Sequence, residues 1–303
     1  MRRVEILGLL VLALGLGNSF TTLSVAGKSL SSDESNDLAL IGARVYPSPL
    51  EKPIDNAIVL VHNGKIVAVG MKEKIKIPRN TRRIDCSGLT LVAGFWNSHV
   101  HFTEGKWTNA ASIPSSQLTQ QLQEMLTRYG FTTVFDTGSY WEITKALRQR
   151  ITSGTAEGPR IFSTGEILFP KGASFGKMLE VENAQQGLEV VRKQLGAGVD
   201  AIKIYAQAFW DLNLRMPLEA IRAITAEAHS HGKLVFVHPS NNYGLDAALD
   251  SGVDVLVHTT PQTSQWSEAL LAKMKRGNMA LIPTLKLWRI EVVASRLTRA
   301  GFQ

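Results

Sequence analysis

The sequence predicts an α/β fold, a (β/α)8 barrel of the TIM type with seven of its eight strands present, preceded by a small β element. The chain has 303 residues, of which 44% are hydrophobic, enough for one large α/β domain or two smaller ones. From Gly94 onward, apolar strand-like runs alternate with amphipathic helical stretches. These runs are almost continuously apolar, which is typical of parallel strands covered on both faces. No Gly-rich dinucleotide fingerprint follows any of them, so a barrel is favoured over an open doubly wound sheet.

The first residues have the pattern of a signal peptide. Arg2 and Arg3 precede an apolar run, residues 6–17, which is shorter than the roughly 20 apolar residues that a membrane span needs. Small residues end this segment and suit cleavage after Ala26. We expect a signal peptide over 1–26, a polar linker over 27–37, and a secreted or periplasmic protein without stable membrane insertion after cleavage. An uncleaved membrane anchor is the alternative.

Residues 38–93 predict the small β element. Two β-rich runs flank Asn63 and Gly64, and this dipeptide supplies the positive φ angles of a type I′ hairpin turn. A third run, residues 82–94, completes the element. His62 lies beside the turn and is expected to be an exposed strand residue.

Residues 94–303 predict the barrel. Strands are expected at "FWNSHVHF", "FTTVFDTG", "RIFSTGE", "DAIKIYAQ", "LVFVHPS", "VDVLVHTT" and "MALIPTL". Apolar residues recur at helical spacing in residues 182–198 and 216–232, and a glycine ends each stretch. A helix over 286–301 is expected after the seventh strand, so an eighth strand would be due just beyond Gln303.

Two histidine pairs have the same spacing and different expected backbones. His99 and His101 lie on a predicted strand, where residues i and i+2 point to the same side and can face one metal ion. His229 and His231 lie at the end of a predicted helix that Gly232 terminates. Residues two apart on a helix point in different directions, so this second pair is expected to interact with the helix carboxyl end.

Three further residues fall at the carboxyl ends of predicted strands, where a barrel carries its chemistry: Lys203, His238 and His258. A single histidine there is more often a hydrogen-bonded core residue. Four of the seven histidines of the chain at strand ends favour a metal site instead. Imidazole ligands suit zinc best, with manganese, iron, cobalt or nickel as substitutes.

Lys203 lies inside an apolar strand, where a charged and unpaired ammonium group is costly. Burial lowers the pKa of such an amine, and a neutral amine can react with carbon dioxide to give a carbamate, an anion able to bridge two cations. The alternative is an ion pair with a nearby acid, such as Asp200 or Asp211.

The segments "LTLVAGFWNSHVHF", "DAIKIY", "VFVHPSN" and "GVDVLVHTTP" resemble the amidohydrolase superfamily, in particular its imidazolonepropionase-like and dipeptidase-like members. The resemblance implies a barrel with a small β-sandwich built from both chain ends. It implies that His99 and His101 bind the more buried of two metal ions, that His238 and His258 bind the second, and that carbamylated Lys203 bridges them.

The implied activity is metal-dependent hydrolysis of a carbon–nitrogen bond, in a cyclic amide, N-acyl amino acid or dipeptide, through a metal-activated hydroxide. The catalytic Asp of the family lies at the end of strand eight, beyond Gln303, so no catalytic acid–base residue is present. The chain as given is therefore expected to be an incomplete fragment with impaired activity. Asn97, where many relatives carry Asp, is a smaller departure.

Substrate and partners are less constrained by the sequence. Lys171, Tyr205 and Trp266 are candidates to contact a small substrate, for instance one with a carboxylate; ordinary loop roles are equally compatible. The net charge of +7 is scattered, which argues against nucleic acid as a partner, and the single Cys86 excludes an internal disulfide. A homo-oligomer is left open. The alternative functions are a non-catalytic secreted metal-binding or scaffold protein, and the same fold running lyase or isomerase chemistry.

Overall fold

The computed structural model describes residues 9–12, 37–173, 178–260 and 266–284. These residues divide into two compact units, each described by itself below. One unit comprises 1–95 with 123–133, and the other 96–122 with 134–303. The helix predicted over 286–301 and most of the predicted signal peptide lie outside the described residues.

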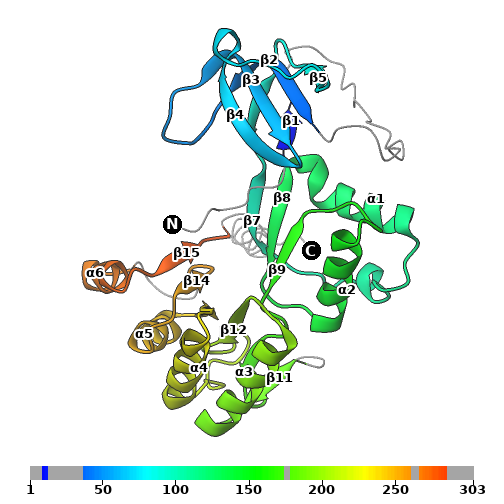
Figure 1. Ribbon diagram of the computed structural model, residues 1–303. Helices are drawn as coiled ribbons and strands as arrows, with labels where there is room; N and C mark the ends of the chain where they lie inside the picture. Colours follow the sequence, from blue (N-terminus) through cyan, green and yellow to red (C-terminus); the bar gives the residue numbers. More distant parts are fainter. Residues whose placement is uncertain (1–8, 13–36, 174–177, 261–265, 285–303) are drawn as a thin grey trace, which may run out of the picture. The chain divides into compact units, whose positions relative to one another are not determined.

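The first unit contains a six-stranded sheet in the order β1-β6-β2-β3-β4, with β5 paired to β2 (Figure 1). Asn63 and Gly64 have φ angles of 49° and 73°, which confirms the predicted hairpin between β3 and β4. Its strands are β1 (Leu9–Leu12), β2 (Leu38–Val45), β3 (Ile54–His62), β4 (Lys65–Met71), β5 (Arg82–Asp85) and β6 (Thr90–Ala93).

The core of this sheet is formed by small and aliphatic side chains, among them Ala57, Val59 and Leu91. β1 comes from the segment in which the sequence predicts a signal peptide, and it pairs antiparallel with β6. Removal of that segment stays a prediction. The described residues of the unit form one sheet, so the β-sandwich also stays a prediction.

The second unit contains a parallel sheet in the order β11-β10-β12-β13-β14-β15. From β12 onward, neighbours in the chain are neighbours in the sheet, and a helix connects each pair (Figure 1). Its strands are β10 (Leu168–Pro170), β11 (Leu179–Val181), β12 (Ala201–Tyr205), β13 (Leu234–His238), β14 (Val255–Val257) and β15 (Ala280–Ile282). The helices that follow β11 to β14 are α3 (Ala184–Ala197), α4 (Leu218–Ser230), α5 (Asn242–Asp250) and α6 (Glu268–Arg276).

Side chains alternate along these strands, so that one face of the sheet packs against the helices and the other face carries Lys203. Ile202 and Ile204 of β12 pack in one large apolar cluster with Ile221 of α4. Ala201 of β12 and Phe236 of β13 pack on the opposite face in a separate cluster. Lys203 lies between Ile202 and Ile204, so its side chain points away from the helix layer, as the sequence predicts.

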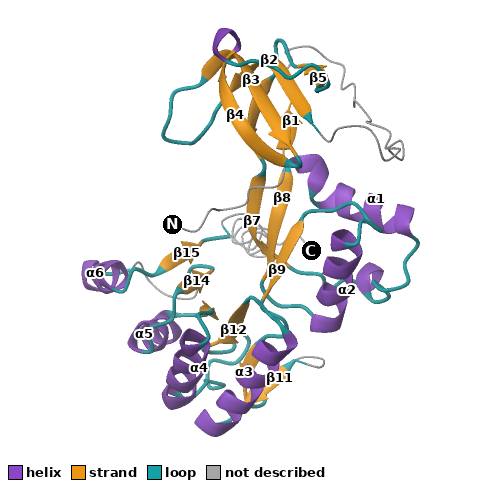
Figure 2. Ribbon diagram, in the orientation of Figure 1, coloured by secondary structure: helices purple, strands orange, loops and turns teal. Residues whose placement is uncertain are grey.

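A second sheet has the order β7-β8-β9 (Figure 2), and residues 96–100 of β7, residues 134–136 of β8 and all of β9 belong to this unit. The elements of this part of the chain are β7 (Phe95–Val100), α1 (Ser115–Met125), β8 (Phe131–Asp136), α2 (Trp141–Thr152) and β9 (Arg160–Ser163). The backbone N–H of Asp200 donates to the carbonyl oxygen of Ser163 at 2.8 Å, which connects β9 to the start of β12.

All seven predicted strands are present, as β7, β8, β9, β12, β13, β14 and β15. The third is shorter than predicted, because β9 ends at Ser163, and the chain forms two further strands, β10 and β11, before α3. β10 takes the pairing position beside β12, with Leu168 opposite Ile204. In the described residues the two sheets are not joined into a closed barrel.

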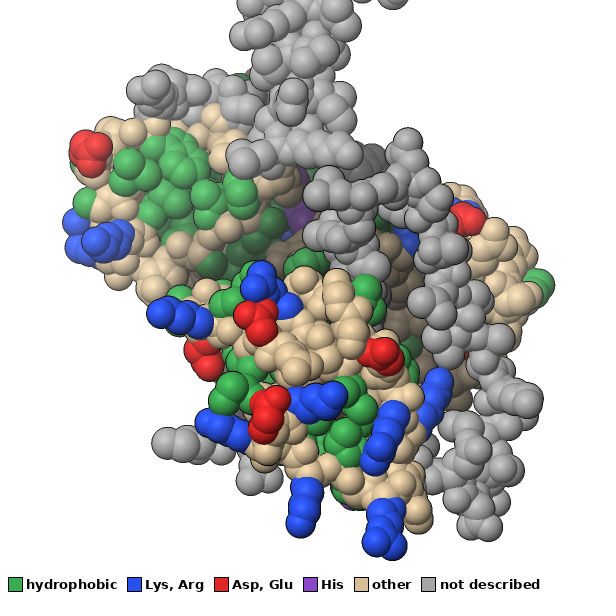
Figure 3. Space-filling model, turned by 90° about the horizontal axis from the view of Figure 1, so that it is seen from above, with side chains coloured by type: hydrophobic (Ala, Val, Ile, Leu, Met, Phe, Trp, Pro, Cys, Tyr) green, Lys and Arg blue, Asp and Glu red, His purple; other side chains and the backbone are tan. Residues whose placement is uncertain are grey.

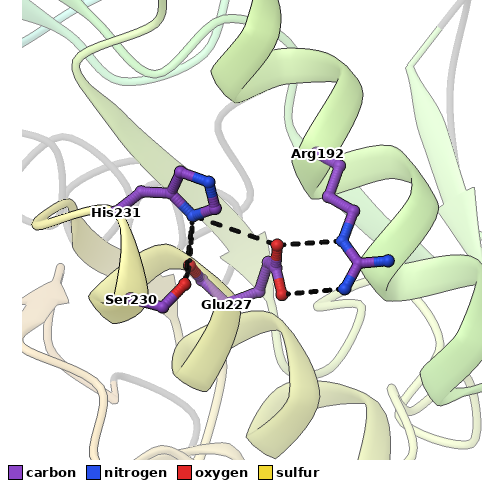
Figure 4. Close-up of polar contacts among 4 residues, drawn as sticks. All are labelled: Arg192, Glu227, Ser230 and His231. Atoms are coloured by element: carbon purple, nitrogen blue, oxygen red, sulfur yellow. Dashed lines mark hydrogen bonds and ion pairs between the residues drawn. The ribbon is translucent and has the colours of Figure 1, made fainter.

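The second histidine pair serves the helix end, as predicted. Nδ1 of His231 lies 3.0 Å from the carbonyl oxygen of Glu227, one turn back in α4. The carboxylate of Glu227 accepts two hydrogen bonds from Arg192 of α3, at 2.9 and 3.2 Å (Figure 4). His229 pairs with Asp254 at 2.8 Å. These contacts connect helix to helix and helix to strand, and they account for both histidines without a metal.

Lys and Arg side chains alternate with Asp and Glu on the face of the molecule that Figure 3 shows. This mixture fits the scattered charge of the sequence. No helix within the described ranges is long and apolar enough to cross a bilayer.

We predict that Gly244→Ala destabilises the protein while Gly196→Ala does not, although both glycines lie in helices. A Cβ at Gly244 would overlap the carbonyl oxygen of Pro239, so α5 would have to move away from the end of β13. A Cβ at Gly196 meets no atom within 4 Å. We expect a loss of about 1–3 kcal/mol for the first variant and a gain of up to about 1 kcal/mol for the second. Denaturant unfolding measures both, and equal effects would contradict the close approach.

Candidate metal centre

Four histidines from three strands, β7, β13 and β14, lie together in the second unit. Nε2 of His99 lies 2.9 Å from Nε2 of His101. The ring centroid of His258 lies 4.7 Å from that of His99 and 4.8 Å from that of His238. The structure therefore brings together the four histidines that the sequence singles out, and their role as metal ligands stays a prediction.

Each histidine reaches this place because of where its strand ends. His99 lies on β7, and His101 follows its last residue, Val100. His238 is the last residue of β13. His258 follows β14 directly and has a φ of 74°, a left-handed backbone that turns the chain out of the sheet. β13 and β14 are parallel neighbours, so His238 and His258 lie at the same edge of their sheet, and His99 and His101 come from the other sheet.

Lys203 is buried in the middle of β12, with 1% of its surface exposed. Its Nζ has no hydrogen-bond partner among the described residues. Burial lowers the pKa of this amine well below its usual range, which favours the neutral form. A charged Lys203 would repel protonated histidines, and this repulsion contributes to the lowered pKa values of His99 and His258.

The ion-pair alternative for Lys203 is not formed. Asp200 pairs with Arg148 at 2.8 Å and also accepts the backbone N–H of Ser163. Asp211 accepts the backbone N–H of Asn213 at 2.9 Å. Both carboxylates are engaged elsewhere, which leaves Lys203 as a buried amine that favours its neutral form.

The imidazoles of the centre are neutral at physiological pH. Burial lowers the pKa of His258 to about 3, and it lowers the pKa values of His99, His101 and His238 as well. For His101, Asp136 and the carbonyl of Gly138 act in the opposite direction. Neutral imidazole is the form that binds a metal, because one ring nitrogen then keeps its lone pair.

Two rings are oriented by a contact at Nδ1. Nδ1 of His101 lies 2.8 Å from the carbonyl oxygen of Gly138, and Nδ1 of His258 lies 2.5 Å from Oγ1 of Thr284. A carbonyl oxygen only accepts, so Nδ1 of His101 carries the proton and Nε2 is left with the lone pair. The sequence does not single out Thr284, although it follows a predicted strand as the histidines do.

A third ring is held by stacking. The ring of Tyr205 lies parallel to that of His238, with centroids 4.1 Å apart and planes 7° apart. Phe169 stacks on the other side of Tyr205 at 4.5 Å. Burial raises the pKa of Tyr205 to about 12, so its phenol is protonated at physiological pH.

The donor set fits a divalent metal in its chemistry. Nδ1 of His99, Nδ1 of His238 and Nζ of Lys203 are buried and have no hydrogen-bond partner among the described residues. Buried polar atoms are normally paired, so three such nitrogens in one centre indicate a group that they would bind. As arranged in the described ranges, no group of three or more His, Cys, Asp or Glu side chains could hold a metal ion, so the fit is one of donor chemistry and not of completed geometry.

Asp136, at the end of β8, is a buried carboxylate beside this centre that the sequence reasoning missed. It accepts hydroxyl hydrogen bonds from Ser139, Thr144 and Ser163, at 2.6, 2.7 and 2.8 Å. Burial raises its pKa, and these donors together with His101 oppose the rise. The available signal was its place: an acid at the carboxyl end of a predicted strand.

The candidate substrate residues have different surroundings. Tyr205 contacts the centre through His238. Lys171 pairs with Glu182 at 2.6 Å, and Trp266 donates its indole N–H to Thr260 at 2.6 Å.

The side chain of Asn97 accepts the backbone N–H of His99 at 3.1 Å. Asn97 therefore shapes the strand that carries His99.

Comparison with protein-family models and with curated proteins gave no match. Solved structures do match. A Bifidobacterium longum protein described as a prolidase shares 27% identity, with a TM-score of 0.69 over 82% of this chain and 61% of that one. A Xaa-Pro dipeptidase with bound methionine shares 20% identity, with a TM-score of 0.71 over 86% of this chain and 70% of that one. Ochratoxinase from A. niger shares 20% identity, with a TM-score of 0.68 over 86% of this chain and 68% of that one.

The chain spans less than two thirds of the length of the B. longum protein, of which 61% is covered. These neighbours are members of the amidohydrolase superfamily. The chain is thus structurally related to the amidohydrolase superfamily, as its motifs predict.

Proposed function

We propose that this chain carries the metal centre of a hydrolase that cleaves carbon–nitrogen bonds. The observation that supports this most strongly is the meeting of four neutral imidazoles, near the ends of their strands, with the charge-disfavouring buried site of Lys203 in the middle of β12. The names of the structural neighbours agree with this reaction, since they include a prolidase and a Xaa-Pro dipeptidase.

In this proposal His99 and His101 hold one metal ion, His238 and His258 hold the second, and Lys203 bridges them as a carbamate. The set is rich in imidazole, for which zinc is the best match. When bound, the ions would lower the pKa of water and polarise the scissile carbonyl group. The two sheets of the second unit would be parts of a closed (β/α)8 barrel, and the first unit would be part of a β-sandwich.

The residues of the chain prepare the centre in three ways. Burial keeps the imidazoles neutral, so that they need not lose a proton to bind a cation. Contacts at Nδ1 turn His101 and His258 so that Nε2 is left for the metal. The neutral amine of Lys203 attacks carbon dioxide through its lone pair, forms the N–C bond and releases one proton, which yields the carbamate anion.

The proposed substrate is a small cyclic amide, N-acyl amino acid or dipeptide. Tyr205 is the proposed contact for a substrate group beside His238, and the fully buried Phe169 supports its ring from the other side. Lys171 and Trp266 remain proposed contacts for the rest of the substrate, including a carboxylate. Cleavage of the signal peptide would place the enzyme in the periplasm or outside the cell.

We predict that the purified chain binds zinc and that His101→Ala and His238→Ala each lower the bound zinc per chain. His231→Ala, in the other histidine pair, should bind as much zinc as the parent, because its ring contacts Glu227 instead. Metal analysis after dialysis against zinc measures all four proteins. A parent chain without bound metal would contradict the proposal and favour the non-catalytic scaffold.

We predict that Lys203 carries a carbamate. After incubation with zinc and ¹³C-labelled bicarbonate, ¹³C NMR should show one carbamate signal in the parent chain. Lys203→Met should abolish this signal, whereas Lys193→Met should retain it, because Lys193 is exposed on α3. A parent spectrum without the signal would contradict the bridging role.

We predict that the protein hydrolyses dipeptides or N-acyl amino acids and that a chelator reduces the rate at least about tenfold, with recovery on adding zinc. Product analysis distinguishes this reaction from lyase or isomerase chemistry, because only hydrolysis releases a free amine and a free carboxylate. Metal-independent turnover, or a product without a new carboxylate, would overturn the assignment.

A further inference from the structure

We propose that Asp136 is the positioning residue for His101, acting through the backbone of residues 137–139. This inference rests on the proposed function in treating His101 as a metal ligand. Asp136 is fully buried at the end of β8 and makes no hydrogen bond to His99 or His101 among the described residues. Its charge acts on His101 directly, and its hydrogen bonds reach the centre through the loop that it holds.

The carboxylate holds this loop at two points with one oxygen. Oδ1 of Asp136 accepts the hydroxyl of Ser139 at 2.6 Å and the backbone N–H of Gly138 at 3.3 Å. The other oxygen, Oδ2, accepts the hydroxyls of Thr144 and Ser163 at 2.7 and 2.8 Å. One oxygen thus fixes the loop, and the other attaches the carboxylate to α2 and β9.

The loop then contacts His101 and the residue after it. The carbonyl oxygen of Gly138 accepts from Nδ1 of His101 at 2.8 Å. Ser139 Oγ accepts the backbone N–H of Phe102 at 2.7 Å. The ring of His101 and the backbone that carries it are therefore both tied to groups that Asp136 holds in place.

Glycine is required in this loop. Gly138 has a φ of 143°, and a Cβ there would overlap the side chain of Ile167. Its carbonyl direction is thus set by the turn and by the carboxylate, not by a side chain of its own. A carbonyl held in one direction selects one tautomer of His101, with the proton on Nδ1 and the lone pair on Nε2.

A purely structural role predicts something different. If Asp136 only joined β8, α2 and β9, losing a bond to either of its oxygens would have comparable consequences. If it positions His101, the Oδ1 side must matter to the histidine more than the Oδ2 side. Ser139→Ala removes the link on the first side, and Thr144→Val removes a similar hydroxyl on the second.

The experiment compares Asp136→Asn, Ser139→Ala and Thr144→Val in the full chain. Asp200→Asn serves as a carboxylate control, because Asp200 bonds Arg148 and the backbone of Ser163 instead of the loop. The first readout is the tautomer of His101 in the apoprotein, from long-range ¹H–¹⁵N correlation spectra of the imidazole. The second is the zinc dissociation constant, with unfolding midpoints measured alongside.

We expect Ser139→Ala and Asp136→Asn to give mixed tautomers of His101 and to weaken zinc binding by about 10- to 100-fold. Thr144→Val and Asp200→Asn should leave the tautomer and the zinc affinity unchanged, even where they lower the unfolding midpoint. If Asp136→Asn does not fold, the comparison of Ser139→Ala with Thr144→Val decides.

An unchanged tautomer in Ser139→Ala would overturn the inference, as would equal losses of zinc affinity in Ser139→Ala and Thr144→Val. The tautomer is read without metal. A parent chain that binds no zinc would therefore contradict the proposed function, while the tautomer of His101 could still be measured and would still test this inference.

Discussion

A lysine side chain without a partner in an apolar strand is the constraint on which the centre depends. Lys203 has 1% of its surface exposed and no hydrogen-bond partner among the described residues. A charged ammonium group there would have to be desolvated without compensation, at a cost of several kcal/mol. This cost favours the neutral amine of Lys203, whose nitrogen is then nucleophilic and lies among uncharged imidazoles.

Because side chains alternate along a β-strand, Lys203 lies on the face of β12 that carries the centre. Ile202 and Ile204 point to the helices and anchor β12 in the largest apolar cluster, which forces Lys203 to the opposite face. The register of β12 with β13 places Tyr205 beside His238, and their rings stack. The packing that stabilises the sheet therefore also orients ligands, so core substitutions in β12 would be felt at the centre.

The sequence was sufficient where a single local rule decides the outcome. Alternation predicted the face of Lys203, and the Asn63–Gly64 pair predicted the hairpin. The sequence alone did not predict the pairing of strands where distant segments compete for one partner strand. β10 forms because Leu168 pairs with Ile204, a choice between residues far apart in the chain that no local pattern encodes.

The same limit applies to the centre. Lone strand-end histidines could be singled out by position, but their supporting groups could not. Asp136 and Thr284 act on His101 and His258 through contacts made only in the folded chain. Acids and hydroxyls at strand ends are common, and spacing alone does not say which of them faces a histidine.

Three successive parallel strands share an unusual ending. Ser240 after β13, His258 after β14 and Thr284 after β15 have φ angles of 62°, 74° and 45°. β-branched or bulky side chains rarely adopt this left-handed conformation, which costs about 1–3 kcal/mol each. Glycine would relieve the strain but would lose the side-chain contacts made there, because Oγ of Ser240 donates to the carbonyl oxygen of Gln207 and Nδ1 of His258 lies 2.5 Å from Oγ1 of Thr284. Strain at these strand ends is thus accompanied by hydrogen bonds that glycine could not make.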